Sequence, residues 1–128
     1  MRILMLVFIF SFLAQGIARA QDAAAGEVVF SKQCKDCHHI GEGISDKRGP
    51  VLNGLFGRKA GSIPGYDYSD ANRNSTVIWD EKTLREYVRD PHAVIPGTRK
   101  RFIGLTDEQN IEDLITYLKQ FDAFEKQR

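Results

Sequence analysis

The segment Cys34-Lys35-Asp36-Cys37-His38 carries the most distinctive chemistry in this chain. Its two thiols lie three positions apart, and an imidazole follows the second thiol directly. Each thiol can add across one vinyl group of a porphyrin, and the histidine then lies under the ring and can ligate the iron. C-x-x-C-H is the spacing of covalent haem attachment. The motif therefore predicts one haem c bound through Cys34 and Cys37, with His38 as the proximal iron ligand.

Other uses of a paired cysteine fit this sequence less well. A redox dithiol of the thioredoxin kind follows a strand in a βαβ unit, whereas residues 26–33 predict a helix. A structural zinc site needs two further ligands at a second paired spacing, and only His39 and His92 remain. A disulfide between Cys34 and Cys37 would close a very short loop and stabilise the fold little. Haem attachment is therefore the favoured interpretation.

Three segments have the pattern of helices. Residues 23–33 form a helix-favouring window, and a second helix is expected from an Asp80 cap to Asp90-Pro91, which ends it. A third begins at Thr106, where Gln109 three residues later completes a capping box. Its apolar residues recur every three or four positions, at Ile111, Leu114, Ile115, Leu118 and Phe121. No run predicts a sustained strand, so we expect an all-α fold whose long loops wrap a bound group.

Residues 1–20 have the composition of a secretory signal peptide. Arg2 gives a positive start, an apolar run extends from Ile3 to Ala14, and Ala18-Arg19-Ala20 fits a cleavage site. The run is too short to span a hydrocarbon core of roughly 30 Å, so the alternative to cleavage is an uncleaved interfacial anchor. Covalent haem is attached on the outer side of the bacterial inner membrane. The leader and the motif together predict a periplasmic protein with residues 21–128 as its haem domain.

The formal net charge of the chain argues against some classes of binding partner. Cleavage would lower the formal net charge from +1 to −1, because the leader contains two basic residues and no acidic one. This near-neutral balance argues against nucleic acid and against an anionic membrane surface as partner. A chain of this size is one domain with a marginal apolar core, to which a buried porphyrin would add apolar mass. We expect a monomer without stable membrane insertion.

Several longer runs between Gly26 and Lys119 match the pattern of one family. They are Cys34-x-x-Cys37-His38, Gly49-Pro50-x-Leu52-x-Gly54-Leu55-Phe56-Gly57-Arg58, Gly65-Tyr66-x-Tyr68-x-Asp70-Ala71-Asn72, Trp79, Leu84-x-x-Tyr87, Ile95-Pro96-Gly97-Thr98 and Asp113-Leu114-Ile115-x-Tyr117-Leu118. On these runs the chain resembles the class I cytochromes c of the mitochondrial type and their short periplasmic bacterial relatives. The resemblance implies a small all-α fold, with three main helices and long loops around one covalent haem.

The resemblance also implies a function. A protein of this family is a soluble single-haem electron carrier, not an enzyme. It moves one electron between redox partner proteins through a partly exposed haem edge.

The resemblance assigns roles to several residues around the haem. The Pro50 carbonyl would accept a hydrogen bond from the free ring nitrogen of His38, which raises the basicity of that ligand. Tyr68 and Trp79 would donate to a buried haem propionate, and Arg58 nearby would offset its charge.

On the opposite side of the haem, the resemblance implies a polar network of Asn72, Tyr87 and Thr98 beside the sixth iron ligand. It also implies that Gly26 allows the first and last helices to approach closely.

The chain departs from the family at the sixth ligand. The family's loop contains a methionine that ligates the iron, but here the loop reads Pro96-Gly97-Thr98-Arg99-Lys100-Arg101-Phe102, with Lys100 in that place. No methionine occurs beyond Met5. Four states are open: ligation by Lys100, ligation by His92, a bound water or hydroxide, and an empty position. His39 cannot reach the far face because it adjoins the proximal ligand, and an arginine stays protonated.

Ligation by Lys100 requires loss of its proton. From a reference pKa near 10.4 the loss costs about 4.6 kcal/mol at pH 7, at about 1.36 kcal/mol per pKa unit. Burial against a haem lowers this cost because it disfavours the charged form. In the competing arrangement, Lys100 extends outward and keeps its ammonium in water. We take Lys100 as the expected sixth ligand, with a lowered reduction potential as the result.

A second departure concerns the surface around the haem edge. The family surrounds this edge with lysines that steer acidic partners. Here the matching positions are occupied by Val28, Gln33, His92, Ala93, Thr106 and Asp107. Positive charge remains only at Lys47 and Arg99, with Arg101 close by. The alternative to an electron carrier is a haem protein whose open or labile sixth site binds a small ligand or turns over peroxide.

Overall fold

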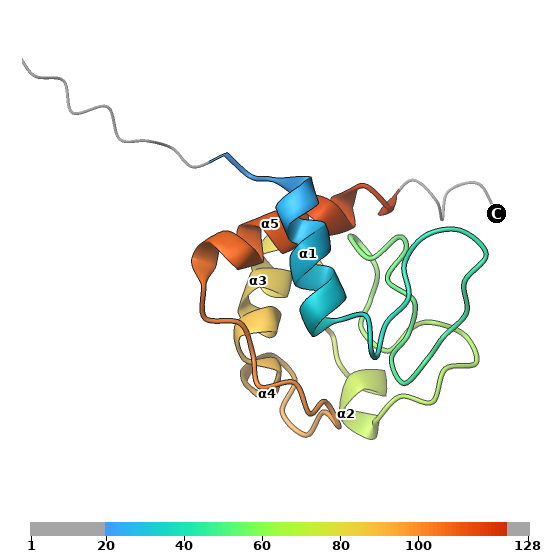
Figure 1. Cartoon of the computed structure of the whole chain (residues 1–128). Coiled ribbons are helices and arrows are strands. Elements are labelled where there is room, and N and C mark those ends of the chain that lie inside the picture. The colour runs from blue at the N-terminus through green and yellow to red at the C-terminus, as the bar shows by residue number, and fades with distance from the viewer. Residues whose placement is uncertain (1–19, 123–128) are drawn as a thin grey trace, which may run out of the picture.

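The computed structural model describes residues 20–122, so the predicted leader lies outside the described residues except for its last position. Five helices occur in this part of the chain: α1 (Ala23–Gln33), α2 (Asp70–Arg73), α3 (Glu81–Arg89), α4 (Pro91–Val94) and α5 (Glu108–Lys119). Within residues 20–122 there is no strand, and a single antiparallel bridge joins Lys59 to Ile78. The expected all-α fold is confirmed, and its three main helices are α1, α3 and α5 (Figure 1).

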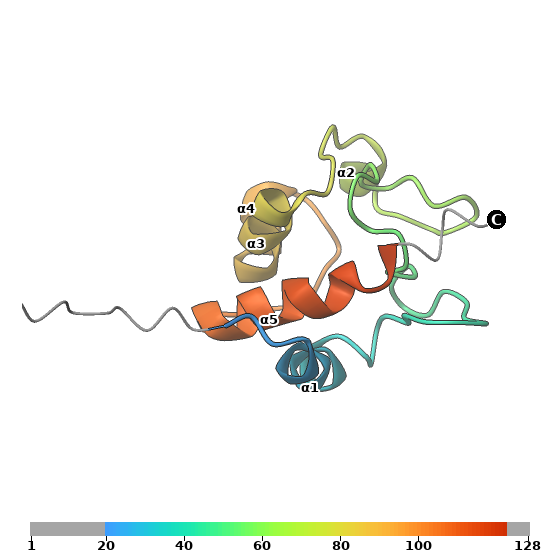
Figure 2. The ribbon, with the colours of Figure 1, turned by 90° about the horizontal axis from the view of Figure 1, so that it is seen from above.

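Helices α1 and α5 cross and pack closely (Figure 2). The Asp22 carboxylate caps α1 by accepting hydrogen bonds from the backbone of Ala24 and Ala25. At the crossing, a Cβ on Gly26 would lie only 1.9 Å from the Asp113 carbonyl oxygen. The aromatic rings of Phe30 and Tyr117 meet beside it with centroids 5.6 Å apart. Glycine is therefore required at the crossing, as expected from the sequence.

Helix α3 has the predicted ends. The Asp80 carboxylate accepts a hydrogen bond from the Thr83 backbone, and the helix ends at Asp90. Asp90 then caps α4, which has Pro91 in its first turn. Leu84 and Val88 form the buried side of α3.

Three ion pairs connect α3 to α5. They are Arg85–Glu112, Arg89–Glu108 and Lys119–Glu81. The pair Arg85–Glu112 is bidentate, because Nε lies 2.6 Å from Oε1 and Nη2 lies 3.0 Å from Oε2. These contacts fix the two helices along their polar sides, while their apolar sides face the core.

The predicted cap of α5 was wrong by one residue. Asp107, not Thr106, caps the helix, and its carboxylate accepts a hydrogen bond of 2.8 Å from the Asn110 backbone. An ionised carboxylate at a helix N-terminus also interacts favourably with the helix dipole, which a threonine hydroxyl does not. Gln109 consequently does not close a capping box, and its amide donates to the Asp113 carboxylate at 2.8 Å.

The core lies between α1, α3 and α5. Its most buried members are Ile111, Leu114 and Ile115 of α5, with 0 to 2% of their surface exposed. Residues 34–69 form long loops that extend away from α3 on the side of α2 (Figure 1). None of the helices in residues 20–122 is long and apolar enough to cross a membrane.

Candidate haem site

The cysteine–histidine motif lies at the C-terminal end of α1. Cys34 is the residue that ends the helix, and its backbone N–H donates to the Phe30 carbonyl at 2.8 Å. Cys37 and His38 both donate backbone hydrogen bonds to the Cys34 carbonyl, at 3.0 and 2.8 Å. Both thiols are free. The tight turn thus holds two thiols and one imidazole together at the end of a helix that α5 fixes in place.

The loop that follows orients the His38 imidazole. Nδ1 lies 2.7 Å from the Pro50 carbonyl oxygen. Because a carbonyl only accepts, Nδ1 carries the proton and Nε2 keeps its lone pair for a metal. A Cβ on Gly49 would lie 2.4 Å from Cε1 of this ring, so only glycine leaves room for it. Burial, and then the charge of Lys100, lowers the pKa of His38 to about 4.

Lys100 reaches His38 from a loop that is distant in the chain. Its Nζ contacts Nε2 of the imidazole, although the two residues are 62 positions apart in the chain. Burial lowers the pKa of Lys100 below its ordinary value, against the effect of the two cysteine thiols. A neutral imidazole and an amine with a lowered pKa are both nitrogen donors that can bind iron. The chemistry of this donor set therefore fits a haem iron, which these two nitrogen atoms would hold.

The other two histidines point elsewhere. Nε2 of His92 lies 3.0 Å from the Lys100 carbonyl oxygen, and the His92 side chain is exposed. Nδ1 of His39 lies 2.8 Å from the Ser45 carbonyl oxygen. His92 thus contacts the backbone of the residue that competes with it as sixth ligand. Sequence reasoning missed this contact, for which no sequence signal exists.

A polar network lies beside Lys100. Thr98 Oγ1 donates to Asn72 Oδ1 at 2.9 Å, and Tyr87 shares a hydrogen bond with the Thr98 side chain. Burial raises the pKa of Tyr87 to about 12. The structure brings together the three residues expected there and adds Ser69, whose hydroxyl donates to Asn72 Oδ1 at 2.7 Å. Ser69 also caps α2, and a serine before Asp70 was the signal that could have identified it.

Tyr68, Trp79 and Arg58 come from the segments between α1 and α3, and the Trp79 ring packs on Tyr87 of α3 with centroids 4.8 Å apart. Tyr68 and Trp79 are each 8% exposed. Burial raises the pKa of Tyr68, and a hydrogen bond with the Ile63 backbone and the charge of Arg58 act against this shift. Arg58 donates to the carbonyls of Asn53 and Val51 at 2.9 and 3.0 Å. It also lines a cavity of about 460 Å³. Their role toward a propionate stays a prediction.

The surface residues expected around the haem edge are all exposed, including Val28, which is 50% exposed, and Arg99, whose side chain is 61% exposed. Sequence reasoning missed Ile103, which is 97% exposed and lies in the same loop as Arg99 and Arg101. Apolar and neutral side chains thus accompany the few cations of this surface.

Comparison with known proteins identifies the family. The family model described as Cytochrome c matches residues 23–122. The chain belongs to the cytochrome c family. It is 58% identical to cytochrome c2 of Blastochloris viridis over 120 residues, which cover 92% of this chain and 94% of that protein. It is 56% identical to cytochrome c-550 of Bradyrhizobium diazoefficiens over 100 residues, covering 78% and 73%. Cytochrome c of Cannabis sativa is 47% identical over 102 residues, covering 80% and 92%.

Membership of the cytochrome c family confirms the predicted cofactor and the predicted class of protein. The family binds one covalent haem c, and the two cysteines of this chain have the spacing for it. Its members are electron carriers and not enzymes. When bound, the haem supplies an iron that alternates between the ferric and ferrous states. The chain would supply the attachment through its two cysteines, and the nitrogen atoms of His38 and Lys100 and the polar network lie together at this site.

Proposed function

We propose that this protein is a soluble periplasmic electron carrier whose haem iron is held by His38 and Lys100. The observation that carries the proposal is the contact of the Lys100 amine with the lone-pair nitrogen of His38. Pro50 and Gly49 fix one partner of this contact. The other partner takes the place where relatives of this family have a methionine ligand.

The presence of lysine in place of methionine determines whether the reduction potential is higher or lower than in these relatives. Methionine ligation raises the potential of a cytochrome c, because a thioether favours ferrous iron. A neutral amine favours ferric iron instead, so the protein holds its electron less tightly. We propose that its midpoint potential lies well below that of relatives with histidine and methionine ligands.

The proposed location rests on the leader. Residues 1–20 direct export and are removed, and residues 21–128 remain as a monomeric haem domain. Relatives of similar length are bacterial cytochromes c2. The partners are redox proteins of the periplasm or its membranes, not nucleic acid, and the domain does not insert stably into the bilayer.

The alternative function, a small-ligand binder or peroxidase, needs a free group near the iron to move protons. Of the candidates, Tyr87 is hydrogen-bonded to Thr98 and its pKa is raised to about 12. His92 is directed at the Lys100 carbonyl. These contacts favour the electron-carrier function over the small-ligand or peroxidase function.

Substitution of Lys100 by methionine tests the proposal. Lys100→Met should raise the midpoint potential and produce the weak red absorption band of ferric iron bound to methionine sulfur. Arg101→Met is the matched control, because it adds a methionine one position later and keeps Lys100. It should change neither quantity. A Lys100→Ala protein with an unchanged ferric spectrum would show that lysine is not the ligand.

The attachment is tested separately from the ligand. Mass spectrometry of the denatured protein should show one haem retained, and Cys34→Ala with Cys37→Ala should release it into acidified solvent.

A further inference from the structure

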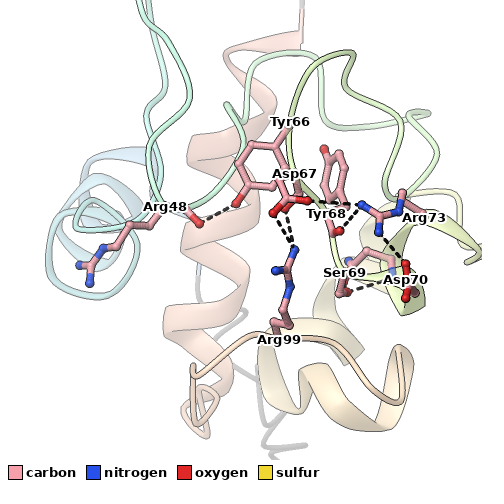
Figure 3. Close-up of polar contacts among 9 residues, drawn as sticks. Arg48, Tyr66, Asp67, Tyr68, Ser69, Asp70, Arg73 and Arg99 are labelled. Atoms are coloured by element: carbon pink, nitrogen blue, oxygen red, sulfur yellow. Dashed lines mark hydrogen bonds and ion pairs between the residues drawn. The ribbon is translucent and has the colours of Figure 1, made fainter.

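The residue immediately before Lys100 joins its loop to a distant segment. Nη2 of Arg99 donates to the Asp67 carbonyl oxygen at 2.8 Å and lies 3.4 Å from Oδ2 of the same residue (Figure 3). One aspartate therefore binds the guanidinium through both its backbone and its side chain. The two residues are 32 positions apart.

A second arginine holds Asp67 in place. Nη1 of Arg73 lies 3.4 Å from Asp67 Oδ1 and 2.5 Å from the Tyr68 carbonyl oxygen (Figure 3). Nη2 of Arg73 lies 2.5 Å from Asp70 Oδ1. Arg73 is the last residue of α2, so the Asp67 carboxylate lies between a helix end and the Lys100 loop.

The contacts on both sides of Lys100 define its direction. Thr98 is fixed by Asn72 of α2, and Arg99 is drawn outward to Asp67. The Lys100 carbonyl is bonded by His92. With the preceding residue held outward, Lys100 is the side chain of this segment that extends inward to His38.

We propose that Asp67 is a positioning residue for Lys100. Its carboxylate, oriented by Arg73, holds Arg99 and so opposes departure of Lys100 from the position opposite His38. This inference rests on the proposed function, because it requires Lys100 to be the sixth ligand. The ion pair between Asp67 and Arg99 would therefore determine how readily an added ligand replaces Lys100 on the haem iron.

Titration of the ferric, haem-loaded protein with imidazole measures this replacement through the shift of the main haem absorption band. Asp67→Asn removes the charge and keeps the size and the backbone carbonyl. It should raise the apparent imidazole affinity about two- to fivefold, which corresponds to an exposed ion pair. Arg99→Ala, which removes both contacts, should raise it further. Arg101→Ala is the matched control, because it removes the same charge one residue beyond Lys100, and no described residue pairs with Arg101.

The same titration in a Lys100→Ala background separates positioning from other effects. Lys100→Ala alone should raise the imidazole affinity, and adding Asp67→Asn should then change nothing. An equal effect of Asp67→Asn in both backgrounds would overturn the positioning role, as would no effect in the presence of Lys100. If Lys100→Ala itself leaves the affinity unchanged, lysine ligation is wrong and the inference fails with it.

Discussion

Substitution of Gly26 by alanine tests the contact that holds the haem-bearing helix. The added Cβ would lie 1.9 Å from the Asp113 carbonyl oxygen, 2.5 Å from its carbonyl carbon and 2.7 Å from Tyr117 Cβ. Two of these atoms are backbone of α5, so no side chain can turn away to make room. Helices α1 and α5 must therefore separate.

The size of the effect follows from two opposing contributions. Alanine in place of glycine inside a helix gains about 1 kcal/mol, and overpacking of a tight core costs typically about 1–3 kcal/mol and occasionally more. Because the clash is with backbone, we place its cost at or above the upper end of this range. We expect Gly26→Ala to lower the free energy of unfolding by about 2 kcal/mol.

Urea denaturation of the haem-loaded protein, followed by circular dichroism, measures this loss. At a slope of about 1–3 kcal/mol per molar urea, the midpoint should fall by about 1 M. Ser31→Ala is the control, because it lies on the exposed side of the same helix and should stay within about 0.5 kcal/mol of the parent. A Gly26→Ala protein as stable as the parent would refute the close crossing of α1 and α5.

Three further predictions concern the site, the helix pairing and the partners. Gly49→Ala should displace the His38 ring from the Pro50 carbonyl and lower stability by about 1–3 kcal/mol, and a parent-like unfolding midpoint would contradict this. The Arg85 hydrogen bond lowers the pKa of Glu112, so the pair's stabilisation is complete above the ordinary glutamate pKa and is lost as the pH falls through the lowered one. Glu112→Gln should therefore cost about 0.5–1 kcal/mol at pH 7 and nothing at strongly acid pH, in denaturation series at several pH values. Electron transfer to an oxidase with an acidic docking face should be slow and nearly independent of salt concentration, because few cations remain to steer the encounter. Stopped-flow measurements at several salt concentrations test this. Fast transfer that salt suppresses would contradict the expectation of a partner with a less acidic docking face.

The long elements were predictable because periodicity and capping specify them locally. The bounds of α1 were predicted correctly, and Asp80 and Asp90 marked the ends of α3. The start of α5 was predicted one residue early because Thr106 and Asp107 are both capping residues, and sequence alone did not rank them. Helices α2 and α4 have four residues each, which is too short for a periodic pattern.

The site was predictable only where a motif or a family pattern names a residue. Cys34, Cys37 and His38 follow from their spacing, and the position of Lys100 follows from the loop in which it stands. The contact of His92 with the Lys100 carbonyl spans 8 positions, and that of Arg99 with Asp67 joins exposed residues 32 positions apart. Polar surface residues leave no periodic signal, so such pairs become visible only in three dimensions.

The crossing of α1 and α5 also bears on when the haem can be attached. The Asp22 backbone N–H donates a hydrogen bond of 2.8 Å to the Asp113 carboxylate there, and the two residues are 91 positions apart. Helix α1 has only 11 residues and is marginal by itself, and contacts of such long range form late because loop closure must come first. With export as proposed, the haem is attached outside the inner membrane, after synthesis. Until α5 docks on α1, the two thiols lie in a segment that this crossing does not yet hold, and we expect them to be most open to covalent haem attachment in that interval.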